Sequence, residues 1–228
     1  MGKNDNGNNG RTELVFVVDR SGSMGGLESD TIGGFNSMLS KQRTIAGECR
    51  VTTLLFDHRI ETLHNHLDIC EVNDLTSRDY WVRGSTALLD AIGLAIDRMI
   101  VTQRHTAAAY RAQHVLFVII TDGYENASRR YSLHQIKQMI TYERERYHWE
   151  FVFLGANIDA EQTAGDFGIS PRCATDFHAD GQGIKASFEA VACAATAVRG
   201  GADLDDLSAP DFLGGVRDDY RSRRRMKR

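Results

Sequence analysis

Five side chains with oxygen donors flank apolar segments of the chain and could together bind a metal ion. The run Asp-Arg-Ser-Gly-Ser at 19–23 supplies one carboxylate and two hydroxyls, a second carboxylate follows the apolar run 114–121, and a third hydroxyl precedes a helical pattern. The set contains neither thiolate nor imidazole, so it suits Mg²⁺, with Mn²⁺ or Ca²⁺ as alternatives, rather than zinc or copper. The candidate ligands are Asp19, Ser21, Ser23, Thr86 and Asp122.

Such a site would leave the ion able to accept a further anion. Mg²⁺ takes six oxygen ligands in a near-octahedral array, more than one loop can provide, and it retains water readily. The carboxylates of Asp19 and Asp122 would balance the charge of the ion, while the hydroxyls are neutral. We therefore expect a position that an Asp or Glu of a protein partner could fill.

The segments around these residues predict that they meet at one edge of a sheet. The runs 13–18 and 114–121 are almost continuously apolar, which is typical of parallel strands covered on both faces. The ranges 28–43 and 86–100 carry apolar residues at helical spacing. In open parallel sheets, ligands bind beyond the carboxyl ends of the strands, near the point where the strand order reverses. Candidate ligands follow both strands at this position.

The remaining segments complete an α/β fold. A turn of three residues joins apolar runs at 51–56 and 60–67, which is the length of a hairpin connection, so these strands should be antiparallel. Helical and strand patterns then alternate, and we expect a doubly wound, mostly parallel sheet with one antiparallel edge strand and helices on both faces. The later elements are predicted at 132–147, 150–154, 159–167, 173–177 and 182–198.

These motifs resemble the metal-ion-dependent adhesion site of von Willebrand factor A domains. The resemblance rests on Asp-x-Ser-x-Ser at 19–23, Gly-Ser-Thr at 84–86, Thr-Asp-Gly at 121–123 and the order of elements over about residues 12–200. Stretches such as ESDTIGGFNSM, VRGSTALLDAIG, TDGYENASRRYS and FLGANIDA are similar to small, stand-alone bacterial and phage members. The fold that this implies is a Rossmann-like sandwich.

The resemblance also implies roles for the five residues. Ser21 and Ser23 would coordinate the ion directly, and Thr86 would do so directly or through water. Asp19 and Asp122 would act chiefly through bridging waters, which leaves the sixth position to a partner's Glu or Asp.

Six further residues on the predicted rim of this site could contact a partner. For the three after Asp122, a solvated loop is an equally good interpretation. The segment 155–159 could instead form a turn in which Asp159 caps the next helix. The rim candidates are Arg20, Tyr124, Glu125, Asn126, Asn157 and Asp159.

Two other groups of residues have alternative interpretations. His58, His64 and His66 lie in or beside the predicted hairpin, where an exposed strand face fits them better than a zinc site, since tetrahedral zinc needs further ligands. The four cysteines form no Cys-x-x-Cys pair, so we expect free and mostly buried thiols.

Composition and charge limit the organisation of the chain and its partners. The 228 residues are 42% hydrophobic and 25% charged, as in a single globular domain. Removing the six positive charges of the last eight residues from the net −4 leaves −10 for residues 1–220, which disfavours nucleic acid as the main partner. We expect a disordered segment at 1–11, a domain at 12–200 and a flexible tail with a basic end at 201–228.

The absence of an apolar leader and of a stretch near the ~20 apolar residues of a membrane span favours a cytoplasmic protein. The predicted function is a non-enzymatic, metal-dependent interaction module. The alternative is a metal-dependent hydrolase or phosphotransfer enzyme using the same ion. The chain contains neither a Gly-x-Ser-x-Gly elbow nor a phosphate-binding loop, and its metal-site motifs include no histidine to act as a base.

Overall fold

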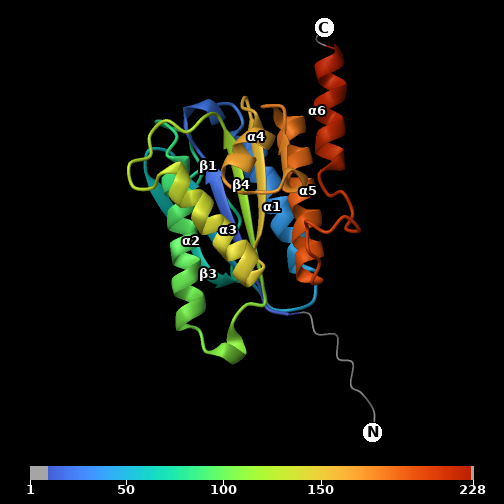
Figure 1. Cartoon of the computed structure of the whole chain (residues 1–228). Helices are drawn as coiled ribbons and strands as arrows, with labels where there is room; N and C mark the ends of the chain where they lie inside the picture. The colour runs from blue at the N-terminus through green and yellow to red at the C-terminus, as the bar shows by residue number, and fades with distance from the viewer. Residues whose placement is uncertain (1–9, 227–228) are drawn as a thin grey trace.

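A six-stranded sheet lies between two layers of helices in the computed structural model, which describes residues 10–226 (Figure 1). The strand order is β3-β2-β1-β4-β5-β6, and every pair is parallel except β2 with β3, which forms the antiparallel edge. This confirms the predicted fold class. Most of the segment 1–11, expected to be disordered, lies outside the described residues. The strands are β1 (Thr12–Asp19), β2 (Cys49–Phe56), β3 (Ile60–Asp68), β4 (His114–Asp122), β5 (Glu150–Ala156) and β6 (Ala174–Asp176).

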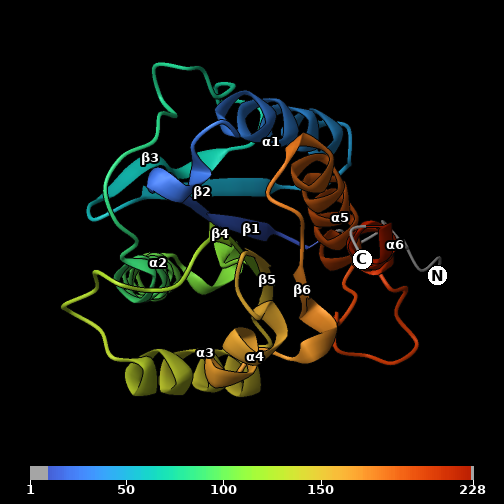
Figure 2. The ribbon, with the colours of Figure 1, turned by 90° about the horizontal axis from the view of Figure 1, so that it is seen from above.

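The helices divide between the two faces of the sheet. Seen from above, α1 and α5 cover one face, and α2, α3 and α4 cover the other (Figure 2). All eight residues of β1 are buried, as expected for a central strand covered on both sides. The helices are α1 (Glu28–Arg43), α2 (Leu88–His105), α3 (Leu133–Tyr147), α4 (Ala160–Asp166), α5 (Gly181–Arg199) and α6 (Gly214–Met226), with 3-10 turns at Gly22–Met24, Ala108–Tyr110 and Pro171–Cys173.

The strand order reverses at β1, which has β2 on one side and β4 on the other. The β1–β2 pair extends in register to Asp19 opposite Phe56, and the β4–β5 pair extends to Asp122 opposite Ala156. Because β1 and β4 are parallel, Asp19 and Asp122 leave the sheet at the same edge. The topology therefore brings both predicted carboxylates to the switch point.

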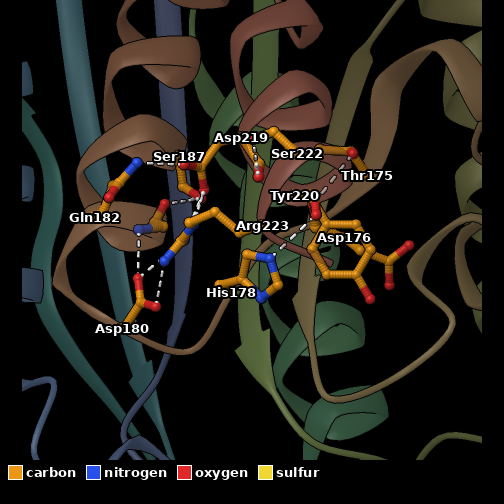
Figure 3. Close-up of polar contacts among 11 residues, drawn as sticks. Thr175, Asp176, His178, Asp180, Gln182, Ser187, Asp219, Tyr220, Ser222 and Arg223 are labelled. Carbon is orange, nitrogen blue, oxygen red and sulfur yellow. Dashed lines mark hydrogen bonds and ion pairs between the residues drawn. The ribbon is translucent and has the colours of Figure 1, made fainter. Parts of the chain in front are cut away.

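The prediction of a flexible tail over residues 201–228 is wrong for the part that the structure describes. Helix α6 packs beside α5 and β6 (Figure 1). Leu204, Leu213 and Val216 are buried and dock this segment on the body. Figure 3 shows the polar contacts of α6, in which the Arg223 guanidinium donates to both carboxylate oxygens of Asp180 at 2.5 and 3.1 Å. The apolar anchors are too few and too widely spaced to produce a helical pattern in the sequence.

The histidines of the β2–β3 hairpin differ from expectation. Register shifts around Thr53 interrupt the alternation of β3. His64 is buried, with Nδ1 3.0 Å from the Thr53 hydroxyl, so the predicted exposed face is wrong for this residue. Within residues 10–226, no three His, Cys, Asp or Glu side chains are grouped so that they could hold a metal.

All four cysteines are free, as expected, but only Cys49 and Cys173 are buried, and Cys70 and Cys193 are exposed. No helix in the described part of the chain is long and apolar enough to cross a membrane.

Candidate metal centre

The Asp19 carboxylate joins the ends of β1 and β4. Its Oδ1 accepts a hydrogen bond from the Ser21 backbone N–H at 2.7 Å, and its Oδ2 accepts one from the Thr121 hydroxyl at 2.7 Å and one from the Asp122 N–H at 3.3 Å. Asp19 has no exposed surface. Burial raises the pKa of its carboxyl, although these hydrogen bonds oppose the shift. A nearby cation would favour the ionised form that burial disfavours.

Three hydroxyls from two distant segments meet next to Asp19. The Ser21 hydroxyl lies 3.0 Å from that of Ser23, and it accepts a hydrogen bond of 3.0 Å from the Thr86 hydroxyl. Ser21 and Thr86 are buried, whereas Ser23 is exposed. The backbone holds the two segments together, because the Gly22 N–H donates to the Gly84 carbonyl at 3.1 Å.

Asp122 completes the set from the end of β4. Its side chain is buried, and burial raises the pKa of its carboxyl, opposed by a hydrogen bond from Asn157 Nδ2 to Oδ1 at 2.5 Å. The next residue, Gly123, has φ +133°, a conformation that L side chains rarely adopt, and a Cβ there would lie 3.5 Å from the Ser23 hydroxyl. The chain therefore needs glycine to turn away from the site directly after Asp122.

Two of the rim candidates position predicted ligands. Asn157, at φ +55°, donates to Asp122 as described. Asn126 makes two hydrogen bonds with Thr86: its Oδ1 accepts from the Thr86 N–H at 2.9 Å, and its own N–H donates to the Thr86 carbonyl at 3.0 Å. Both amides therefore lie behind the candidate ligands and hold them in place.

Two other rim candidates cap helices, and one is exposed. The Glu125 carboxylate accepts from the backbone N–H groups of Leu89, Ala127 and Ser128, so it stabilises the start of α2. Asp159 is the N-cap of α4, which confirms the capping interpretation. Tyr124 is 63% exposed and remains available to a partner.

Arg20 does not belong to the rim, because its side chain is fully buried. Its Nε donates to Asp57 Oδ2 at 3.1 Å, and its Nη2 donates to Glu61 at 2.7 Å. Asp57 Oδ2 also accepts from Arg83 Nε at 2.8 Å. The hydrogen bond and charge of Arg83, together with the charge of Arg20 and the Arg59 N–H, overcome burial and hold the pKa of Asp57 below its usual value.

The cluster formed by Asp57, Arg20, Arg83 and Glu61 positions two of the loops that carry candidate ligands. Arg20 belongs to the loop after β1, and the Asp57 carbonyl accepts from the Ala87 N–H at 2.9 Å, next to Thr86. Asp57 cannot be recognised from the sequence, because an aspartate in a hairpin turn is an ordinary turn residue and nothing marks it as buried.

The arrangement fits a hard divalent cation by the chemistry of its donors. The Ser23 and Thr86 hydroxyls each lie within hydrogen-bond distance of the Ser21 hydroxyl, beside two carboxylates whose burial disfavours their charge. Every donor is oxygen, the preference of Mg²⁺, Mn²⁺ and Ca²⁺.

Comparisons with known proteins identify the fold. A scan against protein-family models finds no match, and a search of curated proteins finds no similar sequence. Among solved structures, the pilus adhesin SpaC from Lactobacillus rhamnosus GG aligns with a TM-score of 0.61 at 12% identity, over 82% of this chain and 30% of that one. Proximal thread matrix protein 1 from the mussel byssus aligns with a TM-score of 0.56 at 15% identity, over 82% and 46%.

The same mussel protein, with a zinc-occupied metal-ion-dependent adhesion site (MIDAS) motif, aligns with a TM-score of 0.55 at 13% identity, again over 82% of this chain and 46% of that one. The minor pilin PilB from Streptococcus sanguinis, as a D319A mutant, aligns with a TM-score of 0.53 at 12% identity, over 88% and 64%. The chain thus spans less than half the length of the mussel and SpaC structures.

These comparisons contradict the predicted cytoplasmic location. The similar structures come from a byssus and from pili, which are surface or extracellular settings. The absence of an apolar leader and of a membrane-spanning stretch is not positive evidence for the cytoplasm, so the prediction of a cytoplasmic location is wrong. The strand order, the switch-point loops and the likeness to a MIDAS-bearing structure together establish that this chain has the fold of a von Willebrand factor A domain.

Proposed function

We propose that this chain is a non-enzymatic interaction module that binds one divalent cation, Mg²⁺, and through it a carboxylate of a protein partner. The observation that carries the proposal is the meeting of the Ser21, Ser23 and Thr86 hydroxyls beside Asp19, at a switch point of the sheet. Ser21, Ser23 and Thr86 are the direct ligands in this proposal, and Asp19 and Asp122 act chiefly through water. Nucleic acid is not the proposed partner, since the body of the chain is acidic.

The hydrogen bonds of Asp19 support an ion that remains electrophilic. Both of its carboxylate oxygens already accept hydrogen bonds from the protein, so its charge is shared with those donors. The three hydroxyls contribute no formal charge. A hard anion in the remaining position would therefore form a short, charge-assisted contact, and a neutral amide would gain much less.

The surroundings of the serines favour binding over the alternative of hydrolysis or phosphoryl transfer. In this proposal the Ser21 and Ser23 hydroxyls are bound to the metal, so neither is free to act as a nucleophile, and no histidine in the metal-site motifs can act as a base. The similar structures are matrix, adhesin and pilin proteins, which agrees with a binding role.

Metal binding is tested by titrating the full chain with Mn²⁺ and following the free ion by spin resonance, with Mg²⁺, Ca²⁺ and Zn²⁺ as competitors. We expect one Mn²⁺ per chain and a loss of affinity of at least about tenfold in Asp122→Ala and in Ser21→Ala. Asp74→Ala, which removes an exposed carboxylate paired with Arg43, is the control and should bind normally. If Asp122→Ala binds Mn²⁺ as tightly as the natural chain, the site is wrongly placed.

The partner's carboxylate is tested by capturing partners with and without chelator and then changing their contact-surface Asp and Glu residues singly to Asn or Gln. One substitution should weaken binding in Mg²⁺ by about 2–5 kcal/mol and have little further effect in chelator, because a charge bound to the metal would be lost. A complex that survives chelator unchanged would show that recognition does not pass through the ion.

A further inference from the structure

A hollow of about 470 Å³ opens beside the candidate metal centre, and its lining includes residues of α2, α3 and α4. These three helices cover the same face of the sheet (Figure 2). We infer that the partner segment whose carboxylate binds the metal also carries a bulky apolar side chain, aliphatic or aromatic, that fills this hollow. The inference rests on the proposed function and specifies the chemistry of the partner.

Three of the residues that line the hollow are near neighbours, in the sequence, of residues of the metal centre. Its lining includes Gly123, which follows Asp122, and Ile158, which follows the Asn157 that donates to Asp122. It also includes Leu88, two residues beyond Thr86. A segment that places a carboxylate on the ion therefore has its neighbouring side chains beside this opening.

The walls of the hollow present apolar surface. Leu88, Ile158 and Phe167 are buried, whereas Leu133 is 43% exposed and Tyr124 is 63% exposed. Leu133 and Tyr124 are two of the few large apolar or aromatic side chains that the described structure leaves exposed, and both line this one hollow. Covering them would remove apolar surface from water, which favours binding by an apolar group.

The charged groups on the walls exclude an anion from the hollow. The Glu125 carboxylate is occupied by the N–H groups at the start of α2, and Asp159 caps α4 through the Gln162 N–H. Asp166 is the third acidic side chain of the lining, and its helix places no basic residue in its last turn. A partner carboxylate is therefore repelled from the hollow and attracted to the ion, while an uncharged apolar side chain meets neither penalty. One partner segment can therefore place its carboxylate on the ion and its apolar side chain in the hollow.

The experiment is selection of a phage-displayed library of random linear peptides on the immobilised full chain in Mg²⁺, with elution by chelator. We expect the eluted peptides to contain Asp or Glu together with a nearby Leu, Ile, Met, Phe, Tyr or Trp. A synthetic peptide from this pool should lose about tenfold in affinity when its apolar residue is changed to Ser.

Variants of the chain locate the effect. Leu133→Ser and Tyr124→Ser should weaken the same peptide about tenfold while Mn²⁺ affinity stays unchanged, because neither residue is a candidate ligand. Leu207→Ser and Tyr142→Ser are the matched controls, since these side chains are 84% and 56% exposed and lie outside the hollow. Both controls should bind the peptide normally.

The outcomes separate this inference from the proposed function. Acidic peptides that elute with chelator but show no apolar preference, or a preference that persists in both hollow variants, would overturn the inference and leave the metal site standing. A chain that binds no Mn²⁺, or peptides that chelator does not elute, would overturn the proposed function and the inference with it.

Discussion

Two arginine–aspartate pairs hold distant parts of this molecule, and their surroundings differ more than their geometry. Arg20 and Asp57 lie behind the metal loops at 3.1 Å, with side chains 1% and 0% exposed. Arg223 and Asp180 join α6 to α5 at 2.5 Å, with side chains 22% and 47% exposed. The Arg223–Asp180 pair is the closer one, but it should contribute less to the stability of the fold, because water screens exposed charges. Removing one partner of a buried pair costs more, because water cannot solvate the charge that remains.

The largest effect should come from Asp57→Ala. The change removes an acceptor that Arg20 and Arg83 share and leaves the buried Arg20 guanidinium paired with the exposed Glu61 carboxylate alone, so we expect a loss of about 3–5 kcal/mol in the free energy of unfolding. Mn²⁺ affinity should fall as well, although no candidate ligand is removed. Urea unfolding measures the first effect, with Asp74→Ala as the surface-pair control. Equal losses in the two variants would remove the distinction between buried and exposed pairs.

A smaller effect, of opposite sign, should come from Glu13→Gln. Burial raises the pKa of Glu13 to about 7, against the opposing charge of Arg50. Between about pH 4.5 and 7 the folded state holds a proton that the unfolded chain has released, so stability falls as the pH rises through this window. At about pH 8 the Gln variant should be more stable than the natural chain by up to about 3 kcal/mol, and at low pH the difference should vanish.

Urea unfolding across the pH range checks this prediction, with the exposed Glu71→Gln as control. Glu150, whose pKa burial also raises to about 7, keeps part of the pH dependence in the Glu13 variant. A Glu13→Gln chain with the same pH profile as the natural protein would mean that Glu13 ionises normally.

The smallest effect should come from Arg223→Gln. Loss of its pairs with Asp180 and Asp219 should cost less than about 1 kcal/mol at low salt and almost nothing at high salt, because the Arg223 and Asp180 side chains are partly exposed. Leu213 and Val216 are buried and should keep α6 docked. Unfolding at two salt concentrations, compared with helicity by circular dichroism, measures this. A large loss that salt does not reduce would place this pair in the same class as Arg20 and Asp57.

The sequence predicts the elements that depend on a local pattern of residues. It does not predict features that depend on contacts between residues far apart in the chain. The strand runs, the helix over 28–43 and the hairpin are all present, because alternation, apolar continuity and turn length are local properties. The positions of Ser21 and Thr86 follow from topology once the strands are known. The sequence predicts Arg20 on the rim, whereas its side chain is buried, because its burial depends on Asp57 and Glu61, which lie about forty residues away in the chain. Helix α6 cannot be predicted from the sequence, because its stability depends on contacts with the body of the domain rather than on its own apolar pattern.

The central place of β1 also sets an order of assembly. This strand is synthesised before its parallel neighbour β4, which begins only at His114, and the Asn157 contact comes later still. A nascent chain that ends before β4 carries the Asp-x-Ser-x-Ser loop without Thr121 or Asp122 to meet it. The proposed ion therefore cannot serve as an early template for folding, as zinc does in small zinc-dependent domains, and must enter a scaffold whose long-range strand pairing has already occurred.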